Sequence, residues 1–221
     1  DHPDPSRAQL STFKSLVQRM KDGTLPALAG GLLDQAANSN NVKITGKDWQ
    51  TMFQGDVFVW MDYISVPQLG DNHTEQDAGD LASAVNSIPA YIERSTHFIA
   101  LAPTIEHTDL PGTYCDQNSW LTRGWCRVEF CSLLLAMNHQ VPAIIVKGSN
   151  VPSMMSGVSA ISRPPGLGEY TCCKRDHCIN GRSIPCDKIV IGNVVYRMLE
   201  AKLSTLRAAA AKDPSKLLEF R

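Results

Sequence analysis

The chain has 221 residues, of which 43% are hydrophobic and 19% charged, and its net charge is −1. The near-neutral charge gives no field to attract nucleic acid or an anionic membrane surface, and no apolar run approaches the ~20 residues that span a bilayer. The hydrophobic content is enough for a packed core.

The first third of the chain is predominantly helical in pattern. Apolar residues at helical spacing predict a helix that Asp4 or Ser6 caps and Gly23 ends. A weaker pattern predicts a helix over 25–37, and a short one is expected over 45–53. The period changes at residues 56–63, DVFVWMDY, whose uninterrupted apolar and β-branched run predicts a strand buried on both faces.

Strands and helices alternate from residue 56 onward. The expected elements are a helix over 81–94, a strand over 97–102, a helix over 119–138, a strand over 142–147 and a last helix over 187–211. This order predicts an α/β fold with a parallel sheet and right-handed crossovers. A doubly wound sheet would have one more strand, which we expect either upstream of Asp1 or as an edge strand from residues 150–190.

We divide the chain into four parts. These are an N-terminal helical segment that packs on the core, an α/β core, an irregular cysteine-rich region, and a C-terminal helix with its tail: 1–55, 56–148, 149–186 and 187–221.

The most distinctive stretch is SWLTRGWCRVEFC, residues 119–131. Trp125 and Glu129 are four residues apart, so on a helix they stand on the same side, one turn from each other. A carboxylate on a half-apolar helix face costs free energy unless something holds it. We therefore interpret Glu129 as a side chain that faces a ligand.

Three segments in this order resemble a known superfamily. VFVWMDYISVPQ is similar to a strand and loop of heterokaryon-incompatibility domains, where Trp60, Asp62 and Gln68 fill the pattern. SIPAYIERSTHFIALAP resembles the helix and strand that follow in those domains and in TIR domains. LTRGWCRVEF matches the Arg-x-Trp-x-x-x-Glu of the former and the Trp-x-x-x-Glu of NAD-cleaving TIR domains. The resemblance covers roughly residues 56–148 and implies a flavodoxin-like, TIR-like three-layer domain with flanking helices.

The resemblance also implies a chemistry. TIR enzymes cleave the nicotinamide–ribose bond of NAD, which here would make Glu129 the catalytic carboxylate, NAD a substrate, and a permanently bound cofactor unnecessary. The substrate-binding candidates are Trp125, Asp62, Tyr63, Gln68, Arg123 and Arg127. Arg123 and Arg127 would clamp a pyrophosphate, and Asp62 would stand at the carboxyl end of a strand, where open parallel sheets bind ligands.

Each of these residues has a structural alternative. Glu129 can interact with the positive end of its helix or pair with an arginine such as Arg94. Trp125 can be a core anchor of the helix, Asp62 a cap of a helix or turn, and the two arginines can be exposed surface residues.

The seven cysteines fall into two groups. Cys115, Cys126 and Cys131 lie in the core-like central region and are expected to be buried thiols of an intracellular, cytoplasmic protein. The second group crowds near the end of the irregular region, where Cys173, His177, Cys178 and Cys186 are a zinc candidate. That spacing lacks a Cys-x-x-Cys pair, so a disulfide and free thiols stay open as alternatives.

Three functions remain open at this point. The chain is a TIR-like signalling domain that acts on NAD, a non-catalytic interaction domain that assembles with itself or a partner, or an accessory subunit held in a larger assembly by its terminal helices. Glu129 one turn past Trp125 favours the first. The second is favoured by the first strand and polar loop of TIR domains, which we expect to lie outside this sequence. The match also departs from heterokaryon-incompatibility sequences at Val128, where they often have glutamine.

Overall fold

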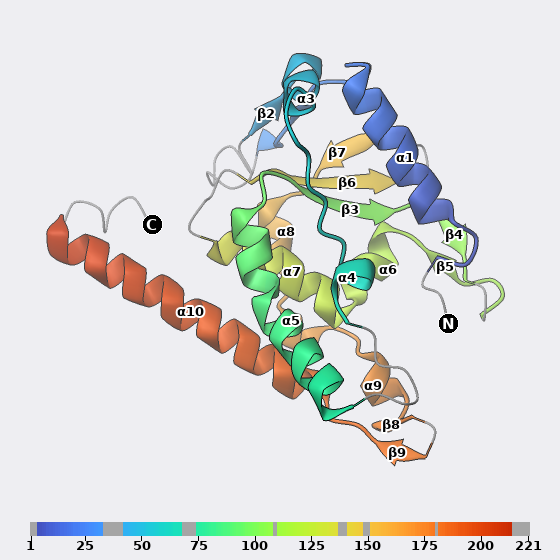
Figure 1. Cartoon of the computed structure of the whole chain (residues 1–221), viewed down its shortest axis with the longest axis vertical. Helices are drawn as coiled ribbons and strands as arrows, with labels where there is room; N and C mark the ends of the chain where they lie inside the picture. Colours follow the sequence, from blue (N-terminus) through green and yellow to red (C-terminus); the bar gives the residue numbers. More distant parts are fainter. Residues whose placement is uncertain are drawn as a thin grey trace.

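A computed structural model describes residues 4–32, 42–67, 74–107, 110–136, 141–147, 151–179 and 181–213. It is a mixed α/β structure with a small central sheet and flanking helices (Figure 1). The helices are α1 Ala8–Lys21, α3 Gly46–Met52, α4 Asp62–Ser65, α5 Glu75–Arg94, α6 Gln117–Thr122, α7 Gly124–Leu135, α8 Gly157–Ile161, the 3₁₀ turn η1 Pro165–Leu167, α9 Thr171–Lys174 and α10 Asp187–Lys212. The strands are β1 Leu28–Ala29, β2 Lys43–Ile44, β3 Phe98–Ala102, β4 Ile105–Glu106, β5 Tyr114–Cys115, β6 Ala143–Lys147, β7 Pro152–Met154, β8 Cys178–Ile179 and β9 Arg182–Ser183.

The central sheet has the order β3-β6-β7. β3 and β6 are parallel, with Phe98 opposite Ala143, as the two predicted buried strands required. β7 pairs with β6 in the antiparallel direction, so the sheet is mixed where the sequence predicted a parallel one. β7 is also the edge strand that was expected from residues 150–190.

Successive side chains of β6 point to opposite faces of the sheet, and each face has its own core. Ile144 and Val146 pack with Leu16 of α1 and Trp49 of α3 on one face. On the other face, alternate residues of β6 and β3 pack against helices α5, α6, α7 and α8. This core includes Ile88, Ile92, Leu121, Phe130, Leu133, Ala143, Ile145 and Ala160. Figure 1 shows the sheet between these helical layers.

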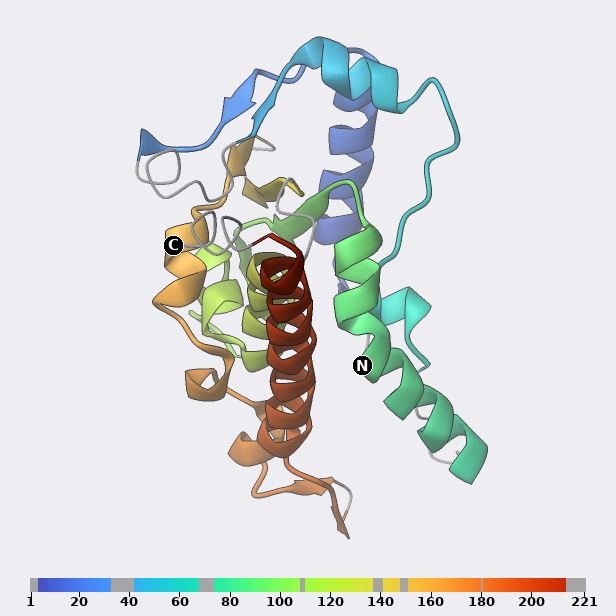
Figure 2. The ribbon, with the colours of Figure 1, turned by 90° about the vertical axis from the view of Figure 1, so that its left-hand side faces the viewer.

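α10 packs on the outer side of α7 through Ile191 and Val194, which join Val128 in a third core. A hydrogen bond of 3.4 Å from Arg197 to Asn86 also ties α10 to α5, and Figure 2 shows the two helices beside each other. The C-terminal part of α10 runs on past the other helices (Figure 1). No helix in the described ranges is long and apolar enough to cross a membrane.

Local sequence signals lie at the ends of several helices. The Asp4 carboxylate accepts the backbone N–H groups of Gln9 and Leu10 at 3.1 and 2.9 Å, and Gly23 follows α1 with a φ of 64°. Thr45 and Thr74 form capping boxes at the starts of α3 and α5. The predicted N-terminal helix and those over 45–53, 81–94 and 187–211 are confirmed, although the N-cap of α1 is Arg7, not Asp4 or Ser6, and α5 begins earlier, at Glu75.

The predicted strand over 56–63 is wrong. Residues 56–61 belong to none of the sheets in the described part of the chain, and Asp62 begins α4 instead. Phe58 is 91% exposed, whereas Trp60 stacks on Tyr91 of α5 at a ring-centroid distance of 5.2 Å. The apolar run therefore packs against α5 through the Trp60 ring and is not part of the sheet.

Two other predictions need correction. The stretch 25–37 contains the short strand β1 where a helix was expected, and residues 33–37 lie outside the described ranges. The single helix expected over 119–138 is broken at Arg123, which ends α6 and precedes α7. At the break, Gly124 donates to the Glu169 carbonyl at 3.0 Å, and the Glu169 N–H donates to the Thr122 carbonyl at 2.8 Å. A distant segment thus satisfies the backbone groups that the interrupted helix leaves open.

Candidate functional site

Glu129 lies in the middle of α7, on a side of the helix that is half-buried. Within the described residues its carboxyl group forms neither an ion pair nor a hydrogen bond, so the pairing with Arg94 that was considered as an alternative is not formed. Burial, reinforced by the negative charge of Asp62, raises the pKa of Glu129 to about 8. The environment of this carboxyl group therefore favours its protonated form.

Two charged residues predicted for the site lie within electrostatic range of Glu129. Asp62, the first residue of α4, is exposed and raises the pKa of Glu129, whereas Arg123, at the junction of α6 and α7, lowers it. The Asp62 carboxylate also accepts the N–H of Tyr63 at 2.7 Å. Asp62 therefore reaches the site from a helix start, and not from the strand end that the sequence predicted.

Cys126 stands one turn before Glu129 on α7 and is buried. Burial, with the nearby charge of Glu129, raises the pKa of its thiol to about 12. A thiol in this state is not a nucleophile at physiological pH, so the titratable chemistry at this position rests on the two carboxyl groups.

Trp125 and Arg127 serve the packing of the domain. The Trp125 indole N–H donates to Asp187 of α10 at 3.2 Å, and its ring packs between two of the cores. Arg127 donates to the backbone carbonyls of Leu121 at 2.7 Å and Pro164 at 3.3 Å. Trp125 thus occupies the core position that was the alternative to a pocket wall, and the Arg127 guanidinium is already engaged by the protein.

The remaining predicted residues of this site are in the segment after residue 62. Tyr63 is half-buried on α4, directly after Asp62. Gln68 lies outside the described residues.

A second group of chemically active side chains lies near the start of α10, the helix that packs on α7. Cys172, Cys173, His177 and Cys186 place one ligand atom each within 4.8 Å of one another. Three of these were predicted as a zinc candidate, but Cys178 is exposed and is not part of the group. Cys172 takes its place, and the sequence analysis missed it because two adjacent cysteines are a poor match to the usual zinc spacings.

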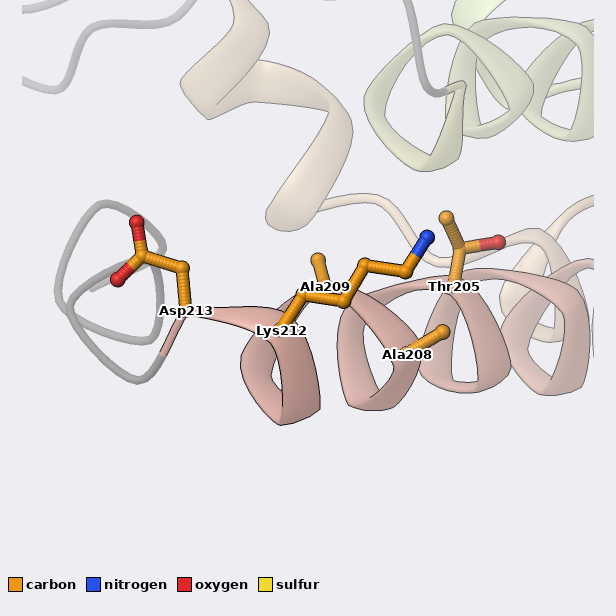
Figure 3. A pocket seen from close by; sticks show the side chains of 5 residues that line it. All are labelled: Thr205, Ala208, Ala209, Lys212 and Asp213. Atoms are coloured by element: carbon orange, nitrogen blue, oxygen red, sulfur yellow. The ribbon is translucent and has the colours of Figure 1, made fainter.

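A shallow pocket of about 360 Å³ lies on the last turns of α10, lined by Thr205, Ala208, Ala209, Lys212 and Asp213 (Figure 3). Lys212 and Asp213 are its two charged lining residues, and the other three lining residues are small. It is remote in the chain from Glu129 and shares no residue with the cysteine group, so it adds nothing to either site.

No protein-family model matches the chain, and neither a curated protein nor a solved structure matches it.

Proposed function

We propose that this chain is a TIR-like domain of flavodoxin-like architecture in which Glu129 supports cleavage of the nicotinamide–ribose bond of NAD. The observation that supports this proposal most is the state of Glu129: a half-buried carboxyl group, without a hydrogen-bonding partner in the described part of the chain, between an acidic and a basic neighbour. Strongly shifted carboxyl groups of this kind are concentrated at functional sites.

The proposed reaction needs a carboxylate and no metal. The bond between ribose C1′ and the ring nitrogen breaks, its electron pair goes to the nitrogen, and neutral nicotinamide leaves. Positive charge develops on the ribose, and an ionised Glu129 would stabilise it, as carboxylates do in glycoside hydrolysis. Water then attacks C1′ and loses a proton, which gives ADP-ribose.

Substrate binding supplies the ionisation that this mechanism needs. The nicotinamide ring of NAD carries a positive charge, and a positive charge next to Glu129 favours its ionised form. The exposed Arg123 guanidinium, already within electrostatic range of Glu129, is suited to bind a phosphate of the same substrate. Arg127 is excluded from this role by its two backbone carbonyls.

The direct test is release of nicotinamide from NAD by the purified chain. We expect Glu129→Gln to lower kcat by on the order of 10²-fold or more, because the neutral amide cannot stabilise the developing charge. Arg127→Lys is not a suitable control, since Arg127 holds the fold; Ser83→Ala, on the exposed side of α5, is expected to leave the rate unchanged. Release that continues at the parent rate in Glu129→Gln would remove this residue from the mechanism.

The pH dependence provides a second readout of the same site. Since the ionised form is the active one, kcat/KM should fall as the pH drops through the pKa of about 8. Asp62→Asn removes a charge that raises this pKa and should shift the acidic limb to lower pH, whereas Arg123→Gln should shift it to higher pH. Burial of Glu129 also predicts that Glu129→Gln is more stable than the parent at pH 9, and that this difference shrinks as the pH falls from about 8 and vanishes below 4.5, the ordinary pKa of glutamate.

A second candidate function is supported by the outer face of α10. Ile189, Tyr196 and Leu203 recur every seven residues and are all exposed, with Leu199 between the last two. Apolar residues at this spacing form the seam of paired helices. This stripe favours an interaction domain or subunit that assembles through its terminal helix.

The assembly function predicts self-association that depends on this stripe. Leu203→Glu places a charge in the seam and should weaken a dimer at least about tenfold, measured by sedimentation velocity over a range of concentrations. Ser204→Glu, the exposed neighbour off the stripe, introduces the same charge and should have no effect. A parent chain that is monomeric at every concentration would contradict self-association.

A further inference from the structure

Four potential metal ligands converge where α9, the β8–β9 hairpin and the start of α10 meet, at the lower end of the molecule in Figure 1. Cys172 and Cys173 come from α9, His177 from the turn that follows, and Cys186 immediately precedes α10. Cys172 is buried and the other three are half-buried. The chain therefore brings together three thiols and an imidazole from 15 residues of irregular sequence.

The three distances from the Cys173 sulfur to the other ligand atoms are close to the edges of a zinc tetrahedron. The Cys173 sulfur lies 3.9 Å from that of Cys172 and 3.8 Å from that of Cys186, and it is 3.6 Å from the His177 Nε2. In a tetrahedral site with Zn–S of about 2.3 Å and Zn–N of about 2.0 Å, two sulfurs lie about 3.8 Å apart and a sulfur and nitrogen about 3.5 Å apart. A disulfide requires about 2.05 Å between sulfurs, which none of the described cysteines approaches.

We propose that Cys172, Cys173, His177 and Cys186 bind one zinc ion as a Cys₃His site. All four tetrahedral positions are filled by the protein, so the site has no open position for a water or a substrate. A closed site of this type is structural and not catalytic. The zinc site is independent of the chemistry proposed for Glu129.

A backbone N–H group already donates to one sulfur of the cluster, because the Asp187 nitrogen lies 3.3 Å from the Cys172 sulfur. Cys186 is the N-cap of α10, which places it at the positive end of a long helix. Zinc binds cysteine in its thiolate form, so binding would release protons.

The backbone conformation at the histidine decides which side chains join the cluster. Asp176 and His177 have φ angles of 47° and 55°, two consecutive left-handed residues that are not glycine. This turn directs His177 to the cluster and sends Cys178 outward into β8, which explains why Cys178 is exposed and outside the group.

The consequence of zinc binding would be to fix the irregular region to the helical layer. Cys172 of the cluster belongs to a small core that also contains Val128 of α7, Tyr170, and Ile191 and Val194 of α10. Five buried residues are few for an independently stable unit, so a metal would supply folding free energy there. The metal would thereby hold α10 against α7.

The test uses the full chain, made metal-free under reducing conditions and titrated with Zn²⁺ alone. We expect one zinc per chain, a higher melting temperature that a chelator reverses, and tetrahedral thiolate bands when Co²⁺ replaces Zn²⁺. Cys186→Ser should weaken zinc binding at least about 100-fold, whereas the matched Cys178→Ser should bind as the parent does. If Cys186→Ser fails to fold, alkylation of the parent decides: zinc should protect Cys172, Cys173 and Cys186 but leave Cys178 reactive.

Three results would overturn the site. They are a parent chain that binds no zinc, equal loss of binding in Cys178→Ser and Cys186→Ser, and alkylation of the cluster thiols at the same rate with and without zinc.

Discussion

Replacing Trp49 by alanine is expected to lower the free energy of unfolding by about 3–5 kcal/mol. Trp49 is 0% exposed and packs with α1, β1, β2 and β6 on one face of the sheet. Its ring centroid also lies 5.2 Å from that of His97. The deletion would leave a cavity between α3 and the sheet that these small strands cannot close. Urea unfolding followed by circular dichroism measures the effect, because the midpoint should fall with an unchanged slope.

Two further variants separate packing from hydrogen bonding at this position. The Trp49 indole N–H is buried and has no acceptor in the described part of the chain. Trp49→Phe keeps most of the ring volume and removes this unpaired donor, so we expect it to cost less than about 1.5 kcal/mol. Phe58→Ala deletes an aromatic ring that is 91% exposed and should stay within about 0.5 kcal/mol of the parent. A Trp49→Ala chain as stable as Phe58→Ala would contradict the described core.

The secondary structure was predictable where the determining interactions are local. Helices α1, α3, α5 and α10 follow from apolar periodicity and from capping residues such as Thr45 within a few positions. Strands β3 and β6 follow from short buried runs. Residues 56–61 are similarly apolar but have no strand beside them in the described residues, and Phe58 consequently faces solvent. A strand needs a neighbour to hydrogen-bond with, and that neighbour is not encoded in the segment itself.

The candidate sites show the same limit. Glu129 was predictable because a carboxyl group in an apolar helix pattern is visible in the sequence. That Asp62 would influence it from a helix start was not, since this depends on where the fold places α4. The choice of Cys172 over Cys178 depends on two left-handed residues, Asp176 and His177, that no cysteine spacing indicates.

Substituting alanine for Gly124 is expected to destabilise the chain by about 1–3 kcal/mol through overpacking, although helix propensity alone predicts the opposite sign. Alanine is favoured over glycine by about 1 kcal/mol in helices, which would predict a gain. A Cβ at Gly124, however, would lie 2.1 Å from the Tyr170 ring, and the Gly124 backbone also closely approaches Gly168. Tyr170 is buried and its hydroxyl donates to the Pro165 carbonyl at 2.7 Å, so the ring cannot move away without losing that bond.

The sign of the effect distinguishes packing from propensity. Gly192→Ala, in α10, introduces a methyl group into open space and should raise the free energy of unfolding by about 0.5–1 kcal/mol. Tyr170→Leu removes the ring atoms nearest to the new Cβ, so Gly124→Ala should cost less in that background, a coupling that a double-mutant cycle in urea measures. The contact matters beyond stability, because the break at Arg123 and Gly124 sets where α7 begins and hence the positions of Arg123 and Glu129. A Gly124→Ala chain that gains stability as Gly192→Ala does would show that the break is not held by Tyr170.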